Sequence, residues 1–382
     1  MKRKVAIIDT LGAHGGAFHL YTFGQSMGLI NSDVKVSLYT NNETHNPAID
    51  GLNFFNFYKD VFSSKSKIIN GIQWIFGSIK SIFHARLLGG SIFHFHIFYT
   101  NILVLFNVLL VKLIFGKVVL TIHDVTSFSE EYKSDFTSSL IYKLADLVLT
   151  HNKFSKSEIE SSKLSLRSPV FIVPHGNYTP FISTQKDKIK SRSYLGLPKD
   201  KKILLFFGMI KEVKGLDLLL ESFKKVLIKN PDTVLLIAGQ PFRNDFSIYN
   251  RIIKKENLTS HCVLHTKFIP HNDVEHYYCA SDLVVLPYKK IYQSGVLMMA
   301  LSYERAVLVS DLPPLKEIIT DNEDGFLFKS EDTDSLSERL NEILSDNRLL
   351  DTVRIKGSKL INTKYNWDSI GALTKKAYNT IY

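Results

Sequence analysis

The stretch IYQSGVLMMALSYERAVLVSD, from Ile291 to Asp311, contains in succession a glycine turn, a short apolar helix and a buried strand. The helix has no charged residue before Glu304, and the small residues Ser294 and Gly295 stand at its start. A helix whose first amides bind an anion needs small residues there, because a large side chain would block the exposed N–H groups. A turn that only reverses the chain tolerates many sequences. The stretch therefore leaves two interpretations open, an anion site and a plain turn.

The chain has 382 residues, more than one hydrophobic core usually supports, so we expect two domains. Its composition, 45% hydrophobic and 22% charged, is that of a globular protein. Two cysteines, Cys262 and Cys279, provide no disulfide framework and favour a reducing, cytoplasmic setting. The first apolar run ends after four residues at Asp9, which is too short for the core of a signal peptide.

Both halves of the chain alternate short apolar runs, typical of strands, with runs of helical periodicity. This alternation predicts parallel sheets that are buried on both faces. The polar, basic stretch 186–202, with Gly196 and Pro198 near its end, is predicted to link the two halves. The predicted fold class is α/β, with two Rossmann-like, doubly wound parallel-sheet domains facing a central cleft.

The net charge of +10 is unevenly spread, because residues 61–123 include six basic residues and no acidic one. The basic residues of this region are Lys65, Lys67, Lys80, Arg86, Lys112 and Lys117, and its aromatic residues include Trp74, Phe76, Phe83, Phe93, Phe95, Phe98 and Tyr99. Basic charge mixed with aromatic rings favours an anionic membrane surface as a partner. A solvated basic face over a core explains the composition almost equally well. No recognised nucleic-acid-binding motif accompanies the charge, so nucleic acid is not expected as a partner.

The apolar segment 91–120 is long enough to cross a membrane, but its polar residues oppose such a span. These residues are His94, His96, Asn101, Asn107 and Lys112. Each of them would be costly at the centre of a bilayer. We instead expect a strand over 91–98, a buried helix over 101–115 and a strand over 117–122.

Two loops of the first half carry candidate ligand-binding residues at predicted strand ends. The first loop contains Gly12, Gly15 and Gly16, whose spacing does not match GxGxxG. A tight turn explains it as well as the close approach of a ligand to the backbone. His123 and His175 follow two later strands. A lone histidine is more often structural, but histidines at successive strand ends favour a polar ligand.

In the second half, Gly208 ends a predicted strand and is followed by Lys211 and Lys214 before the next helix. Two cations beside a strand end and a helix start are typical of a site for a dianion such as a pyrophosphate. The alternative is a solvated basic loop. The position at the carboxyl end of a strand favours the site.

These segments together resemble the GT-B glycosyltransferases, and within them the large retaining group called family 4. The resemblance covers nearly the whole chain, and its pieces are TIHD (121–124), VPHG (173–176), FFG (206–208), KGLDLLLESF (214–223), LLIAG (235–239), HNDVEHYYCASDLVVLPY (271–288), SGVLMMALSYERAVLVSDLPPLKEII (294–319), DGFLF (324–328) and YNWDSIGALTKKAY (365–378). Each piece is loose, but their order and spacing are fairly specific. The resemblance implies an acceptor-binding domain over 1–185, a nucleotide-sugar-binding domain over 186–365 and a C-terminal helix over 366–382 that returns to the first domain.

The resemblance also implies roles for individual residues. The donor diphosphate would contact Gly208, Lys211 and Lys214, together with the backbone amides of Ser294, Gly295 and Val296. His123 would lie near the transferred sugar and orient it, with Gly15 and Gly16 near the diphosphate or the acceptor.

The chain departs from the family pattern at two positions where glutamates are common, E-x7-E. Ile291 and Met299 occupy these positions, so the usual contact to the nucleotide ribose is missing or replaced. The arginine that often follows the glycine is Met209, and Lys211 is the candidate to take its place. Glu317 is a candidate acidic substitute, although a helical surface residue is the simpler interpretation.

The activity that the resemblance implies is a retaining glycosyltransferase, EC 2.4, in which a donor phosphate oxygen takes the acceptor proton. Lysines and oriented amides can offset the growing charge of the leaving diphosphate, so no metal or other cofactor is expected. The expected partners are a nucleotide sugar, a lipid-linked or oligosaccharide acceptor of cell-surface polysaccharide synthesis, and the inner face of the cell membrane, to which a cytoplasmic protein would bind peripherally.

Three other classes are alternatives to this activity. The missing glutamates are the reason to consider a non-catalytic carbohydrate- or membrane-binding protein on a degenerate GT-B scaffold, and an inactive member ranks below the active enzyme. A GT-B-like nucleotide-sugar epimerase would need carboxylates for proton exchange, and none is clearly placed. A NAD-dependent oxidoreductase is disfavoured because neither glycine loop matches the dinucleotide fingerprint.

Overall fold

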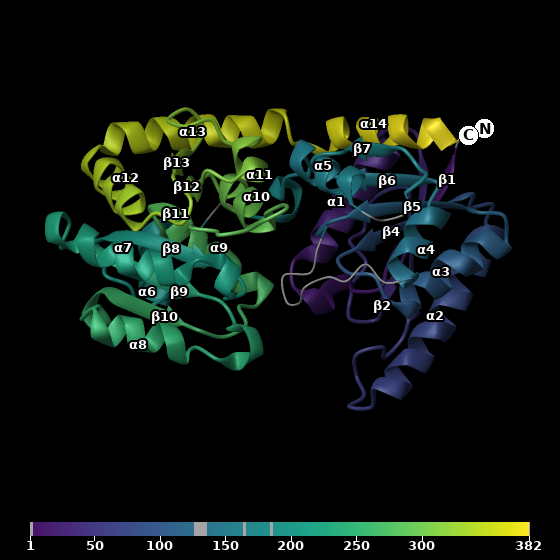
Figure 1. Ribbon diagram of the computed structural model, residues 1–382, viewed down its shortest axis with the longest axis horizontal. Helices are drawn as coiled ribbons and strands as arrows, with labels where there is room; N and C mark the ends of the chain where they lie inside the picture. The colour runs from purple at the N-terminus through teal and green to yellow at the C-terminus, as the bar shows by residue number, and fades with distance from the viewer. Residues whose placement is uncertain (1–2, 126–135, 163–165, 184–185, 382) are drawn as a thin grey trace. The chain divides into compact units, whose positions relative to one another are not determined.

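The computed structural model describes residues 3–125, 136–162, 166–183 and 186–381. The chain forms two compact units, Met1–Gly176 with Tyr365–Tyr382, and Asn177–Lys364 (Figure 1). Each unit contains one all-parallel sheet with its connecting helices. The prediction of two doubly wound α/β domains is confirmed.

The first unit has a seven-stranded sheet in the order β3-β2-β1-β4-β5-β6-β7. Its strands are β1 Lys4–Asp9, β2 Lys35–Asn41, β3 Leu52–Tyr58, β4 Ile92–Ile97, β5 Lys117–Ile122, β6 Leu147–Thr150 and β7 Val170–Ile172. Its helices are α1 Phe18–Asn31, α2 Lys67–Leu87, α3 Ile102–Leu113, α4 Phe136–Leu144, α5 Lys153–Ser161 and α14 Trp367–Tyr378. The strand order reverses between β1 and β4. Because crossovers are right-handed, the connections on either side of this point run over opposite faces of the sheet.

The second unit has a six-stranded sheet in the order β10-β9-β8-β11-β12-β13. Its strands are β8 Lys202–Phe207, β9 Thr233–Ala238, β10 Cys262–His265, β11 Leu283–Leu286, β12 Ala306–Ser310 and β13 Phe326–Phe328. Its helices are α6 Lys188–Tyr194, α7 Leu216–Lys229, α8 Ser247–Lys255, α9 His271–Ala280, α10 Gly295–Ser302, α11 Pro313–Lys316, α12 Thr333–Ser345 and α13 Asn347–Thr363. Here the order reverses between β8 and β11.

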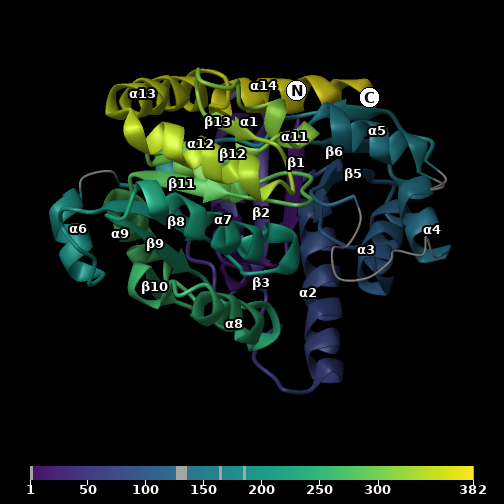
Figure 2. The ribbon, with the colours of Figure 1, turned by 60° about the vertical axis from the view of Figure 1, so that its left-hand side comes forward.

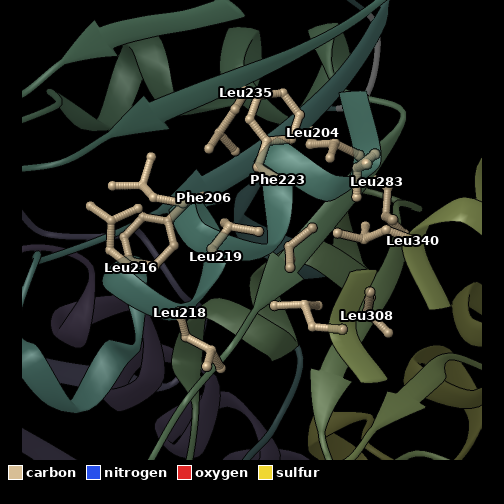
Figure 3. Close-up of a cluster of buried hydrophobic side chains, with 14 of the residues drawn as sticks. Leu204, Phe206, Leu216, Leu218, Leu219, Phe223, Leu235, Leu283, Leu308 and Leu340 are labelled. Carbon is tan, nitrogen blue, oxygen red and sulfur yellow. The ribbon is translucent and has the colours of Figure 1, made fainter. Parts of the chain in front are cut away.

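The core of the second unit forms where α7 packs on the sheet (Figure 3). Leu216, Leu219 and Phe223 recur at helical spacing on one side of α7 and are fully buried. They pack in one cluster with Leu204 and Phe206 of the central strand β8. This packing fixes the position of the turn that leads from β8 into α7.

The prediction of a linker over 186–202 is wrong, because the segment contains helix α6. Asp187 caps the helix by accepting a hydrogen bond from the Lys190 amide. The guanidinium of Arg192 is buried and lies 2.8 Å from the carboxylate of Asp282. A buried arginine is stable only when it is paired in this way, so α6 belongs to the second unit.

The segment 91–120 forms the predicted strand, helix and strand, but the helix is not buried all round. In α3, Leu105, Val108 and Val111 face the core, whereas Ile102 and Leu113 are exposed. Among the described residues, none of the helices has the length and apolar character needed to cross a membrane.

Helix α14 packs along α1 through glycines of both helices. A Cβ at Gly371 would lie 2.0 Å from the carbonyl oxygen of Gly28, and one at Gly28 would lie 2.0 Å from that of Trp367. The buried Trp367 ring fills the space that Gly24 leaves. Residues 365–382 are thereby anchored in the first unit.

We expect Gly371→Ala to lower the free energy of unfolding of the protein by about 1–3 kcal/mol, because the added methyl meets backbone that cannot move aside. The matched control is Gly71→Ala in α2, where a Cβ meets nothing within 4 Å. This control should instead stabilise by about 0.5–1 kcal/mol, the helix preference of alanine over glycine. Thermal unfolding followed by circular dichroism measures both, and equal shifts in the two variants would contradict the close packing.

Candidate functional site

Gly208 lies at the carboxyl end of β8, where the strand order of the second sheet reverses. Its φ of 104° is in the region that favours glycine. Gly239, which ends β9, approaches so closely that a Cβ there would lie 1.9 Å from the carbonyl oxygen of Gly208. A Cβ at Gly208 would in turn lie 3.2 Å from the side chain of Val296. The glycine loop and the start of α10 are therefore neighbours.

A single 3-10 turn, η3 Glu212–Lys214, connects Gly208 to α7. Gly215 ends the turn with a φ of 68°, and a Cβ there would lie 1.8 Å from the carbonyl oxygen of Pro287. The amide of Lys289 donates to the carbonyl of Val213 over 2.9 Å. These contacts hold the turn against the loop that follows β11.

Lys214 is placed by an aromatic ring that the sequence did not single out. Its Nζ lies 3.8 Å from the centre of the Tyr288 ring, a cation–π distance. Tyr288 is fully buried, and its hydroxyl lies 3.4 Å from Oγ of Ser294. Lys211 is less tightly held, with Nζ 5.2 Å from the centre of the Phe242 ring. In the sequence, the position of Tyr288 just after a predicted buried strand is the feature that could have identified it as a site residue.

The start of α10 has the form of an anion site. Ser294 is the N-cap, and its Oγ accepts a hydrogen bond from the Leu297 amide over 3.1 Å. The amides of Gly295 and Val296 come first in the helix, where no preceding turn supplies an acceptor. We call Gly208, Lys211, Lys214, Ser294, Gly295 and Val296 together the anion site, since the second unit brings their two loops into contact.

Apolar residues occupy the two positions where the resemblance expects glutamates. Ile291 and Met299 are both buried in the second unit. Glu317 is half-buried at the C-terminal end of α11. Among the described residues, Oε1 of Gln293 is a buried oxygen without a hydrogen-bond partner. Gln293 is thus a polar group beside α10 that sequence reasoning missed.

Gly15 and Gly16 lie in the first unit, at the end of β1. The loop begins at Gly12, whose amide donates to Oδ1 of Asp9 over 2.9 Å, and Thr22 donates to the other oxygen of the same carboxylate. Burial raises the pKa of the Asp9 carboxyl. Gly15 ends the 3-10 helix Gly12–Gly15, and a Cβ at Gly16 would meet no atom within 4 Å. Asp9 therefore stabilises the start of the loop, and the space beside the Gly16 backbone contains no atom of the described residues within 4 Å.

His123 belongs to a chain of three hydrogen-bonded imidazoles, His96, His123 and His151, which we call the histidine chain. His151 Nδ1 donates to the carbonyl of Val173 over 3.0 Å, so its Nε2 is an acceptor when the ring is neutral. His123 Nδ1 then donates to His151 over 3.0 Å, and His96 Nδ1 donates to His123 Nε2 over 3.1 Å. This order leaves His96 Nε2 as a lone-pair acceptor, and it has no partner among the described residues.

The histidine chain is held neutral by its surroundings. Burial lowers the pKa of His151 to about 4, and burial with neighbouring histidines lowers the pKa values of His96 and His123 well below the ordinary value. His123 is 2% exposed, and both of its ring nitrogens are engaged. A direct hydrogen bond from His123 to a sugar would require it to release one of these partners. Sequence reasoning missed His96 and His151.

A cavity of about 620 Å³ lies in the first unit, beside the point where the strand order reverses. Residues Ile8–Leu11 at the carboxyl end of β1 and His96 with Phe98 at the end of β4 form one side of it. Phe62 and Trp74 contribute aromatic walls from the α2 region. Ligands of doubly wound sheets bind at such reversal points, so this cavity is a second candidate site.

Each unit has the parallel-sheet architecture of a domain of the GT-B fold. Residues 187–360 match the family model described as glycosyl transferases group 1. Over its full length the chain resembles sucrose-phosphate synthase from Thermosynechococcus elongatus, with a TM-score of 0.75, 17% identity and coverage of 100% and 99% of the two chains. It likewise resembles Anabaena HepE in complex with UDP, with a TM-score of 0.72, 14% identity and coverage of 100% of both chains.

Among curated proteins, the lipopolysaccharide 1,2-N-acetylglucosaminetransferase of Salmonella typhimurium is 24% identical over 209 residues, 53% of this chain and 54% of that protein. The chain spans about half the length of the curated relatives it matches. The solved structures show the GT-B fold, and the sequence match to the glycosyl transferases group 1 model covers residues 187–360, which is less than half of the chain.

We expect the free energy of unfolding to fall as the pH drops from about 7 to 5. Burial lowers the pKa values of His94 and His175 to about 3 and that of His151 to about 4, whereas an unfolded histidine titrates near 6.5. Below that pH the histidines of the unfolded chain bind protons, whereas the buried rings of the native protein stay neutral. Each ring therefore lowers the free energy of unfolding by up to about 1.4 kcal/mol for each unit that the pH falls.

Urea unfolding at several pH values measures this slope. His94→Gln removes one titrating ring and should reduce the slope by one proton's contribution. Comparison with this variant cancels the effect of Asp9, whose raised pKa acts in the opposite sense. A variant slope equal to that of the unchanged protein would contradict a neutral buried ring at this position.

Proposed function

We propose that the protein is a glycosyltransferase that moves a sugar from a nucleoside-diphosphate sugar to an acceptor glycan. The observation that carries this proposal is the anion site, in which Lys214 and the start of α10 converge at the strand reversal of the second sheet. Lysine ammonium groups and helix N-terminal amides suit a diphosphate. The structurally similar HepE was solved with UDP, which supports a nucleoside diphosphate as the ligand class.

The proposed chemistry is electrostatic. In glycosyl transfer the sugar becomes oxocarbenium-like, and negative charge grows on the leaving diphosphate. Lys214, which lies over the Tyr288 ring, and the amides of Gly295 and Val296 would stabilise that charge without reorganising, and Lys211 would add a second positive charge. We propose retention of configuration, with a donor phosphate oxygen accepting the proton of the incoming hydroxyl. The lysines then perform the task that a divalent metal performs in other transferases.

We place the acceptor in the cavity of the first unit. Its walls combine aromatic rings, among them Phe62 and Trp74, with the polar edge of His96. Aromatic rings pack against sugar faces and lipid chains alike, so a lipid-linked glycan of a cell-surface polysaccharide fits this lining. The similarity to a lipopolysaccharide transferase supports the same class of acceptor. His96, neutral as part of the histidine chain, would leave its own part of the cavity wall uncharged.

We expect Lys214→Met to lower kcat/KM by about 10²–10³-fold, the usual cost of removing one preorganised donor to the leaving group. Methionine keeps an apolar contact with the Tyr288 ring, so the fold should be retained. The matched control is Lys225→Met on α7, which removes an exposed lysine paired with Asp334. Nucleotide release from a panel of UDP-, GDP- and other donor sugars measures the rate. A turnover close to that of the control would remove Lys214 from the mechanism, and no release with any donor would favour the glycan-binding alternative.

We expect transfer to continue in excess EDTA, because the anion site supplies positive charge through side chains and amides. The measurement compares initial rates before chelation, after chelation and after adding Mg²⁺ or Mn²⁺. Loss of activity with EDTA and its return with either metal would overturn the metal-independent mechanism while leaving the donor site in place.

A further inference from the structure

Helix α2 carries apolar residues on two opposite sides. One side packs on the first unit, with Gly77, Ser78, Ile82 and Ala85 buried. The other side is exposed along the whole helix, at Ile68, Ile69, Ile72, Phe76, Ile79, Phe83 and Leu87. An ordinary surface helix has one apolar side and a polar one. The outer side of α2 therefore lacks the polar residues that contact with water alone would favour.

We call these seven exposed residues the apolar stripe. From Ile69 to Leu87 they recur at spacings of three and four, and Ile68 lies four residues before Ile72, which places all seven along one side of the helix. Ile68 is 75% exposed, Phe76 68% and Leu87 85%, so both ends and the middle of the stripe face solvent. The helix has 21 residues and is about 31 Å long at 1.5 Å per residue. Figure 2 shows α2 as one long, straight helix whose N-terminal end projects beyond α3.

Exposed cations border the apolar stripe. At 3.6 residues per turn, Lys80 and Arg86 fall on opposite edges of it. Lys65 and Lys67 are exposed at the N-terminal end of the helix. No acidic residue occurs between Val61 and His123 in the sequence. The stripe thus presents an apolar centre with basic borders.

We propose that α2 lies flat on an anionic lipid bilayer, with the apolar stripe inserted among the lipids and the bordering cations on their headgroups. This combination of apolar centre and basic edges is that of interfacial helices. An anionic surface accounts for the absence of acidic residues from the sequences of α2 and α3, which a protein partner would not require. On α3, which packs against α2, Ile102 and Leu113 are also exposed and would extend the apolar contact.

The proposed bilayer contact also bears on the acceptor, and this point alone rests on the proposed function. Lys67, Asn70, Gly71 and Trp74, from the N-terminal part of α2, line the cavity of the first unit. The same helix thus carries the stripe and one wall of the cavity. A substrate whose lipid chain remains in the bilayer would reach the cavity along α2.

Flotation with lipid vesicles tests the proposal without any catalytic readout. The full chain is mixed with vesicles of phosphatidylcholine, or of phosphatidylcholine and phosphatidylglycerol in equal parts. We expect flotation with the second kind and little with the first. The double variant Ile72→Glu with Phe76→Glu should reduce binding by about tenfold or more, because charged groups replace two inserted side chains. Lys80→Glu with Arg86→Glu should remove the preference for phosphatidylglycerol.

The control is Ile228→Glu on α7, an 80% exposed residue remote from the stripe in sequence, which should float like the unchanged protein. Thermal unfolding shows that each variant is folded, and the shift of the unfolding temperature with UDP, GDP and other nucleoside diphosphates reports separately on the donor site. Flotation without a shift by any of these nucleotides would support the bilayer proposal and count against the proposed function. No flotation of the unchanged protein, or equal flotation of the stripe variant, would overturn the bilayer proposal. The bilayer proposal would also be overturned if the unchanged protein formed a dimer that the stripe variant could not form, and neither protein bound to vesicles.

Discussion

The reversal of strand order in each parallel sheet is the constraint on which both candidate sites depend. Right-handed crossovers send the connections before and after the reversal over opposite faces of the sheet. The loops at the carboxyl ends of the two central strands therefore diverge and leave room for a ligand. In the second sheet these strands are β8 and β11, and in the first they are β1 and β4.

The residues around this space differ in charge between the two units. In the second unit, glycines at 239 and 215 let loops approach until carbonyl oxygens occupy the space of a side chain, and Lys214 lies over the Tyr288 ring beside Gly215. The result is a positively charged site with amides fixed toward it. In the first unit, burial keeps the histidine chain neutral beside an aromatic cavity. A charged leaving group and a partly apolar acceptor would each find a matching environment.

Helix α2 connects the chemistry of the first unit to its surface. Its inner residues contribute to the core, its N-terminal turns line the cavity, and its outer residues form the apolar stripe. One helix can contribute to the core, the cavity and the apolar stripe because residues three or four apart lie on the same side of it, while the residues between them lie on other sides. Composition showed only that residues 61–123 combine basic charge with large apolar side chains.

The sequence alone predicted the alternation of strands and helices, although not β3 or α2, and it singled out the two loops of the candidate anion site, because periodicity, strand-ending glycines and small helix-start residues are local signals. The prediction from sequence was wrong at α6. The polar composition of the segment 186–202 is typical of a linker, but the ion pair between Arg192 and Asp282 holds the segment in the second unit. Only the tertiary structure brought together His96, His123 and His151, which follow one another across three neighbouring strands but are far apart along the chain. It also decided which side of α2 is exposed. Pairing and burial depend on contacts between distant segments, and such contacts leave no pattern in either segment by itself.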